Sequence, residues 1–165
     1  MKKQLTLYLT IILTAALLCA CAQVDASGKM KDGYYSAEPV DFDDHGWKEF
    51  LTIYVKNNTI VTVEYNAKNP SGFIKSWDMD YMRTMNRTDN TYPNEYTRKY
   101  AAMLLDSQGI EGLDAITGAT HSYDTFLMLA EAVINQAKLG DARVAFITLS
   151  DGTVHYRRNQ AIREM

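Results

Sequence analysis

The chain has 165 residues, 47% of them hydrophobic, and a formal net charge of −3 at pH 7. This acidic balance offers no electrostatic surface for nucleic acid, so no nucleic-acid partner is expected. Both cysteines, Cys19 and Cys21, lie near the N-terminus, which leaves no thiol in the rest of the chain for a disulfide, a Cys-ligated zinc, an iron–sulfur cluster or a thioether-bound haem. Any redox chemistry there requires a bound organic cofactor.

The N-terminus has the layout of a signal peptide. Lys2 and Lys3 precede a mostly apolar run over residues 5–20, and polar sequence follows from Gln23. The run is shorter than the roughly 20 residues that a membrane-spanning helix needs. The sequence therefore predicts an exported protein whose signal peptide comprises residues 1–20.

The end of the apolar run, Leu18-Cys19-Ala20-Cys21, resembles the bacterial lipobox. The resemblance implies that Cys21 carries the lipid, with acyl chains of the palmitate kind, and becomes the mature N-terminus. The protein would then be anchored to the cell membrane on its extracytoplasmic face, with residues 21–31 as lipidated cysteine and flexible tether. The alternative is an ordinary secretory signal that is cut near Ala20 or Ala22.

A strand and a hairpin are predicted at the start of the folded domain. Asp32-Gly33 is a turn signal ahead of a strand that runs to Ala37. Residues 41–46 form a loop, whose three acidic residues and one histidine are expected to be solvated rather than to hold a metal ion. Residues 47–66 alternate between apolar and polar positions on either side of Asn57-Asn58. Because both asparagines tolerate positive φ, the pattern predicts two antiparallel strands joined by a tight turn.

Helical periodicity replaces this alternation after residue 72. Apolar residues recur at helical spacing over residues 74–85, 93–104 and 122–138, which predicts three helices. Pro93 suits the first turn of the second helix, and Gly109 suits its end.

A second hairpin is expected at residues 144–156, around Ser150-Asp151-Gly152, and residues 157–165 form a polar tail. Strands, then helices, then strands predict an α+β fold in which an antiparallel sheet of hairpins packs with about three helices. This domain covers residues 32–156. The sequence leaves open whether its last hairpin completes the sheet or docks on a partner.

A short glycine-containing segment precedes the third predicted helix. It reads Asp114-Ala115-Ile116-Thr117-Gly118-Ala119-Thr120-His121-Ser122. The free N–H groups and the dipole of a helix N-terminus bind anions such as phosphate, and Gly118 and Ala119 leave room for a bulky group. On these grounds alone, the segment is equally compatible with an anion site and with an ordinary capped helix start.

The same segment resembles the D-x-x-S/T-G-A-T motif of the covalent FMN-binding domain family. The residues that match it are Asp114, Thr117, Gly118, Ala119 and Thr120, and His121-Ser122 follow where the family usually has Ser or Thr. The resemblance covers roughly residues 32–141, including Asp32-Gly33-Tyr34-Tyr35, Gly46-Trp47-Lys48-Glu49-Phe50 and the stretch from Gly72 to Asp78. It implies that a flavin transferase, using FAD and Mg²⁺, joins FMN through its phosphate to the Thr120 hydroxyl.

Membership of that family would also give the flavin ring a set of neighbours. Trp77, Tyr81 and Tyr123 are candidates for an apolar wall against the ring, and the alternative for Trp77 and Tyr81 is packing in the core. Lys75 and Ser76 are candidates for hydrogen bonds to the ring edge, with Lys75 favouring an anionic reduced flavin. His121 either touches the flavin or faces solvent.

The family includes small flavin lipoproteins of extracellular electron transfer, which indicates a function for this chain. An exported lipoprotein with one covalent FMN would carry electrons from a membrane donor, of quinone or NADH dehydrogenase type, to an extracytoplasmic acceptor. The sequence shows no nucleotide fingerprint and no nucleophile–base arrangement, so an electron carrier is favoured over a self-sufficient enzyme. Two alternatives stay open: an unflavinylated surface binding or antigen module, and an accessory subunit of a larger membrane flavin reductase complex.

Overall fold

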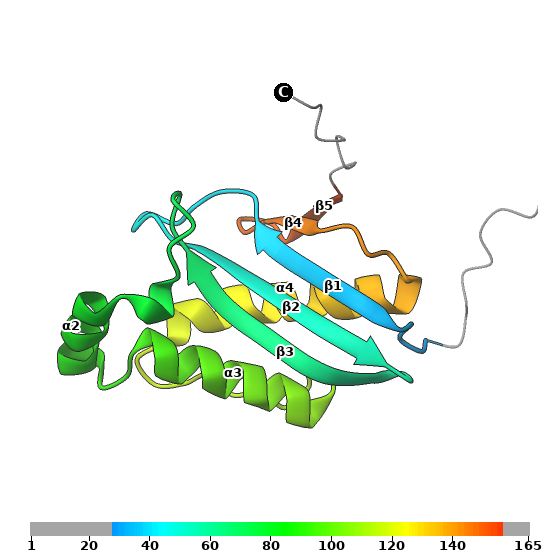
Figure 1. Cartoon of the computed structure of the whole chain (residues 1–165), viewed down its shortest axis with the longest axis horizontal. Coiled ribbons are helices and arrows are strands. Elements are labelled where there is room, and N and C mark those ends of the chain that lie inside the picture. Colours follow the sequence, from blue (N-terminus) through cyan, green and yellow to red (C-terminus); the bar gives the residue numbers. More distant parts are fainter. Residues whose placement is uncertain (1–27, 157–165) are drawn as a thin grey trace, which may run out of the picture.

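The computed structural model describes residues 28–156 as one mixed sheet with helices on one side (Figure 1). The signal peptide, Cys21 and the polar tail lie outside the described residues. The strands are β1 (Gly33–Pro39), β2 (Lys48–Lys56), β3 (Thr59–Lys68), β4 (Ala145–Thr148) and β5 (Thr153–Tyr156). The helices are a 3₁₀ turn η1 (Lys75–Trp77), α2 (Met79–Asp89), α3 (Pro93–Ser107) and α4 (Thr120–Leu139).

The hairpin of β2 and β3 is confirmed. Val55 pairs with Ile60 and Lys56 with Thr59, which leaves Asn57 and Asn58 as the two loop residues. Both have positive φ, 53° and 62°, as a two-residue turn that matches the twist of the strands requires. The backbone N–H of Asn57 also donates to Asp32 Oδ1 at 2.7 Å, which ties the turn to the segment ahead of β1.

The strand order is β3-β2-β1-β4-β5, and it confirms an α+β fold. All neighbouring strands are antiparallel except β1 and β4, which run parallel with Ala37 opposite Ala145. The expected sheet of hairpins therefore contains one parallel pair. Parallel neighbours need a long crossover, and here the chain enters β4 from the helical layer. The last hairpin, β4 and β5, completes the sheet, which the sequence had left open.

The first predicted helix is two elements. Residues 75–77 form η1, and Asp78 then caps α2 by accepting a 2.9 Å hydrogen bond from the backbone N–H of Tyr81. An aspartate in extended conformation is a favoured N-cap because its carboxylate satisfies an otherwise free N–H group. This cap separates the apolar residues of the 74–85 pattern into two short elements, and α2 buries none of its residues.

The other two helices differ from prediction only at their ends. Helix α3 begins at Pro93 as predicted but ends at a left-handed Gln108 rather than at Gly109. Helix α4 begins at Thr120, two residues earlier than the apolar pattern indicated, and Gly140 closes it with a φ of 72°.

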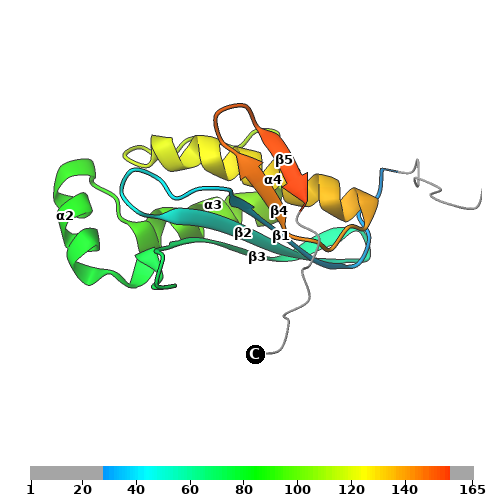
Figure 2. The same ribbon diagram turned by 90° about the horizontal axis from the view of Figure 1, so that it is seen from above.

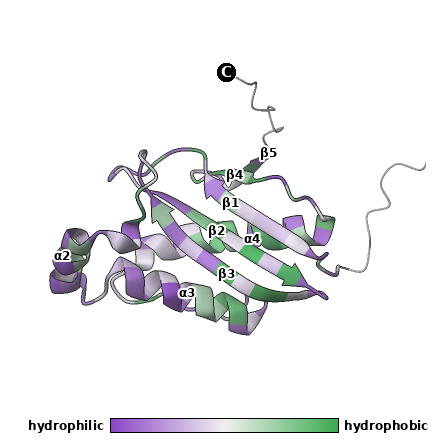
Figure 3. Ribbon diagram, viewed as in Figure 1, coloured by the Kyte–Doolittle hydropathy of each residue, from purple (hydrophilic) through white to green (hydrophobic). Residues whose placement is uncertain are grey.

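The core lies between α3, α4 and one face of the sheet (Figure 2). Inward-facing residues of β2, Leu51, Ile53 and Val55, meet rings from both helices. The Phe126 ring stacks on that of Tyr100 with 4.9 Å between centroids. Hydrophobic and hydrophilic residues follow one another along β2 and β3 (Figure 3), because only one sheet face is packed. No described helix covers the other face, and none between residues 28 and 156 is long and apolar enough to cross a membrane.

Candidate functional site

The segment ahead of α4 is fixed by a tyrosine from α3. The Tyr100 hydroxyl donates to the carbonyl of Ala119 at 3.2 Å and accepts from the backbone N–H of Ile116 at 3.0 Å. The N–H of Ala119 closes a turn onto the carbonyl of Ile116 at 2.9 Å. The loop is therefore held at both ends by one buried side chain, which sets the direction in which α4 begins.

Gly118 is required at this turn for two reasons. Its φ is 81°, a conformation that L-residues with a side chain rarely adopt. A Cβ at this position would also lie 2.3 Å from the backbone oxygen of Asp89. The glycine thus allows the motif segment to pack directly on the connection between α2 and α3. Its side facing Asp89 is filled by protein rather than open for a ligand.

The start of α4 has the properties of an anion site. No side chain caps it, and its first turn contains no acidic residue. Asp124 lies beyond the first turn because the helix begins at Thr120. The helix itself therefore places no negative side chain against its free N–H groups and the positive end of its dipole, although the carboxyl of Glu49, from β2, faces Ser122. Thr120 is exposed, so its hydroxyl is accessible from outside.

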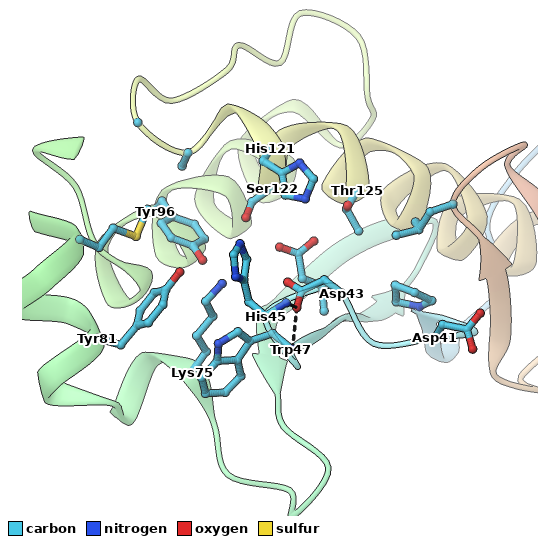
Figure 4. Close-up of a pocket in the computed structure, with 16 residues that line it drawn as sticks. Asp41, Asp43, His45, Trp47, Lys75, Tyr81, Tyr96, His121, Ser122 and Thr125 are labelled. Carbon is cyan, nitrogen blue, oxygen red and sulfur yellow. Dashed lines mark hydrogen bonds between the residues drawn. The ribbon is translucent and has the colours of Figure 1, made fainter. Parts of the chain in front are cut away.

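A cavity of about 220 Å³ lies beside this helix start, at the end of the sheet where β2 begins (Figure 4). The structure places there the predicted site residues Lys75, Tyr81, Gly118, Ala119, His121 and Ser122. His121 is exposed and lines the cavity at the same time. The cavity thus joins η1, α2 and α4, which are distant in sequence.

The aromatic walls of the cavity enclose the ammonium of Lys75. Its Nζ lies 5.0 Å from the ring centroid of Tyr81 and 5.7 Å from that of Trp47, and these rings meet edge to face at 6.1 Å. Lys75 is only 6% exposed, and this burial lowers the pKa of its ammonium, against the raising effect of Glu49 and Asp43. A cation between two ring faces is stabilised by their quadrupoles.

Glu49 is the second charged side chain of the cavity, and it is partly buried. Burial raises the pKa of its carboxyl, and it outweighs hydrogen bonding with Ser122 and Tyr65 and the positive charges of Lys75 and His121. Its Oε2 is buried and accepts no hydrogen bond from any described residue. A buried acceptor without a hydrogen bond lowers the stability of the folded protein, because it has lost its water and gained no partner.

Other predicted residues lie elsewhere. Trp77 is 64% exposed, and its ring contacts that of Phe73 rather than the cavity. Ser76 is buried but accepts from Asn66 Nδ2 at 2.9 Å, between β3 and α3. The Tyr123 hydroxyl donates to the carbonyl of Leu113 at 2.6 Å, which holds that ring against the loop. Asp114 and Thr117 are exposed on the motif loop, outside the cavity lining.

Sequence reasoning missed several lining residues, namely Asp43, His45, Trp47, Glu49, Tyr96 and Thr125. The sequence held a signal for two of them. In steps of two residues, Glu49 and the preceding Trp47 fall on the same side of the strand as Leu51, Ile53 and Val55. A glutamate on the packed face of a strand is a buried acid. Tyr96 follows the apolar stripe of α3 and could not be distinguished from core by periodicity.

The loop before β2 has a structural role. Asp43 Oδ1 accepts from the backbone N–H groups of His45 at 2.9 Å and Trp47 at 2.7 Å. These bonds fold the loop over the cavity entrance and orient Trp47. Across residues 28–156, no group of His, Cys, Asp or Glu is arranged to hold a metal ion.

Fold and site together define a small two-layer α+β domain with a charged, aromatic-walled cavity beside an uncapped helix start. The chain is 35% identical over 127 residues to the 15 kDa lipoprotein of Treponema pallidum (strain Nichols), and the match covers 77% of this chain and 87% of that protein. The chain therefore belongs to the family of this lipoprotein. The expectation of a lipoprotein is supported at that level, whereas the lipid at Cys21 stays a prediction.

A solved structure shares the fold. The CPE2226 protein of Clostridium perfringens superposes with a TM-score of 0.70 at 34% identity, over 72% of this chain and 98% of that one. A Clostridium thermocellum protein solved by NMR has a TM-score of 0.44 at 32% identity, over 66% of this chain and 92% of its own. No family model matches the chain. The names of these proteins mention neither flavin nor electron transfer.

Proposed function

We propose that the protein is an exported lipoprotein that carries FMN on Thr120 and transfers electrons outside the cytoplasm. The observation that supports this most directly is the position of Thr120. Thr120 is exposed at the first residue of an uncapped helix, and its neighbours Ala119 and His121, though not Thr120 itself, line a cavity with aromatic walls. A transferase can reach such a hydroxyl, and the group it attaches can fold back into the cavity.

The helix start suits the phosphate of the attached group. A phosphodiester keeps one negative charge, which the N–H groups of residues 120–122 and the helix dipole would stabilise. The first turn contains no carboxylate to repel it. This contribution is about 0.3–1 kcal/mol at an exposed site, so covalent attachment rather than this interaction retains the group.

The cavity suits a planar ring. Tyr81, Tyr96 and Trp47 offer aromatic surface, and Lys75 and Glu49 offer a donor and an acceptor. FMN supplies electron-transfer chemistry when bound, and the protein supplies orientation and electrostatics. Lys75 would put a positive charge beside a ring held in this cavity, which would favour uptake of electrons. Trp77, Ser76 and Tyr123 contribute no cavity surface and are not retained as ring contacts.

Covalent attachment of the flavin to Thr120 and of a lipid to Cys21 suits a protein outside the cytoplasm. A dissociable flavin would be lost by dilution there, whereas an ester to Thr120 is not. A lipid on Cys21 and a tether over residues 22–31 would keep the domain near a membrane donor of quinone or NADH dehydrogenase type, which raises its effective concentration. Maturation requires an FAD-dependent flavin transferase as partner.

Intact-mass measurement tests the proposal. The domain from Ala22 onward is co-expressed with a flavin transferase in an exporting host, beside Thr120→Val and Thr120→Ser. Valine keeps the shape of threonine without its hydroxyl, and serine keeps the hydroxyl. We expect the wild type and Thr120→Ser to gain the mass of FMN less one water, and Thr120→Val to gain nothing.

The other outcomes decide against the proposal. A reference substrate of the transferase, expressed in parallel, shows that the transferase is active. If this reference gains FMN and the wild type does not, the covalent-flavin function fails and an unflavinylated binding or antigen module is favoured. If the flavinylated protein co-purifies stoichiometrically with a membrane reductase, it is an accessory subunit rather than a free carrier.

A further inference from the structure

Glu49 differs from the other buried polar groups of the fold. Among the described residues, only its Oε2 and the Oε1 of Gln136 are buried side-chain atoms without a hydrogen-bond partner. The Gln136 amide donates to the carbonyl of Arg143, so that side chain is engaged at its other end and lies away from the cavity. Glu49 lines the cavity. Its unsatisfied oxygen therefore lies where a ligand can reach it.

The register of the sheet holds Glu49 in this position. It pairs with Ala67 of β3 and shares the packed face with Leu51 and Ile53. The side chain therefore points into the helical layer rather than into solvent. A carboxylate on this face lowers stability unless a partner compensates it, and in the protein alone Oε2 has none.

Lys75 does not supply that partner. No ion pair joins Lys75 to Glu49 in the described part of the chain, and the lysine ammonium faces the rings of Trp47 and Tyr81 instead. The cavity thus presents an acceptor and a donor that are not paired with each other. A planar ligand with an N–H flanked by carbonyl groups has the complementary edge, and the isoalloxazine ring of FMN has such an edge at its pyrimidine end.

We infer that Glu49 is a ring-binding residue: its Oε2 accepts a hydrogen bond from the ring N–H, and its carboxylate makes the bound flavin harder to reduce. The inference rests on the proposed function and names the group that recognises the ring. Two electrons from the membrane donor and one proton from water add one net negative charge to the cavity. A neighbouring carboxylate opposes that charge.

The test uses the full-length flavinylated lipoprotein in detergent micelles. Glu49→Gln keeps the size of the side chain and an acceptor oxygen but removes the charge. Glu131→Gln is the matched control, because Glu131 is exposed on α4, outside the cavity lining, and loses the same charge. Intact mass first establishes that each sample carries FMN. Spectroelectrochemical titration then gives the midpoint potential and the visible absorption spectrum.

We expect Glu49→Gln to shift the oxidised-to-reduced equilibrium at least tenfold toward the reduced form, which is about 30 mV upward for a two-electron couple. Glu131→Gln should match the wild type. If Glu49→Gln does not fold, Glu49→Asp takes its place. It keeps the charge but withdraws the carboxylate by one methylene, so the visible bands should shift.

The outcomes separate the two hypotheses. If the mass shows no FMN on the wild type, the proposed function fails and this inference with it. If FMN is present and Glu49→Gln has the potential and spectrum of Glu131→Gln, only the role of Glu49 is overturned. For Glu49→Asp, an unchanged spectrum overturns it equally.

Discussion

Strand β2 passes through two different environments on one face. Its second half packs Leu51, Ile53 and Val55 into the core, where each is fully buried among apolar neighbours. Its first half places Glu49 in the cavity, beside Trp47, the residue just before the strand, whose ring faces the buried ammonium of Lys75. The core half is what folding requires, since each large apolar side chain contributes about 1.5–3 kcal/mol on burial. In the cavity half, the unsatisfied carboxylate oxygen of Glu49 works against folding, and this is the group to which the proposed binding role is assigned.

Buried polar atoms are hydrogen-bonded in the core but not all of them are in the cavity. In the core, the Tyr100 hydroxyl both donates and accepts, and the Tyr65 hydroxyl donates to the carbonyl of Ser122 at 3.1 Å. In the cavity, Glu49 Oε2 has no partner among the described residues. Buried polar atoms in folded proteins are nearly always bonded. This exception inside a cavity is what the proposed ring contact at Glu49 would explain.

The core half should be the most sensitive to truncation. Phe126 is fully buried and contacts the rings of Tyr65 and Tyr100, both at 4.9 Å between centroids. Phe126→Ala should lower the free energy of unfolding by about 3–5 kcal/mol, because it removes apolar contact and leaves a void. Urea denaturation followed by circular dichroism measures this. Leu139→Ala is the control, since Leu139 is 54% exposed, and its effect should stay within about 0.5 kcal/mol.

The motif loop should be next in sensitivity. Gly118→Ala meets both a positive φ and the Asp89 oxygen at 2.3 Å, whereas Gly72→Ala meets a φ of 84° with nothing within 4 Å. Gly72→Ala should cost about 1–2 kcal/mol from backbone strain alone. Gly118→Ala should cost more than this, because a backbone oxygen cannot move aside as a side-chain end can. Thermal unfolding midpoints measure both variants. If Gly118→Ala and Gly72→Ala have equal midpoints, the α2–α3 connection moves to accommodate the added methyl group.

The cavity half should show the smallest effect and the opposite sign. Burial raises the pKa of Glu49 above its ordinary value of 4.5, so the folded protein holds this proton more tightly than the unfolded chain. The stability that Glu49 contributes is therefore present below that value and is lost as pH rises through the folded pKa. In unflavinylated protein at neutral pH, Glu49→Gln should be more stable than wild type by about 1 kcal/mol.

The pH dependence of that difference is the diagnostic. Denaturation at several pH values should show the advantage of Glu49→Gln shrinking as the pH falls toward the ordinary carboxyl value. Glu131→Gln should show no such trend. A constant difference at all pH values would mean that Glu49 has the same pKa in the folded and the unfolded protein, and that its charge does not oppose folding.

Individual residues explain where sequence-based prediction succeeded. Asn57-Asn58 located a turn because few residues adopt positive φ twice in succession, and Pro93 marked the start of α3 through a backbone restriction of its own. Asp78 explains one difference, since its carboxylate caps α2 and divides a continuous apolar pattern. The parallel pairing of β1 with β4 depends on residues far apart in the chain, and no local pattern encodes it.

The sequence by itself determined the elements, the α+β class and the threonine motif, because backbone restrictions and apolar periodicity act over a few residues. The tertiary structure decided which side chains share the cavity. It brought Lys75 in and left Ser76 and Trp77 out, because a single 3₁₀ turn points successive residues in different directions. It also placed Glu49 beside the motif of α4, because sheet register and helix packing, rather than spacing along the chain, set that distance.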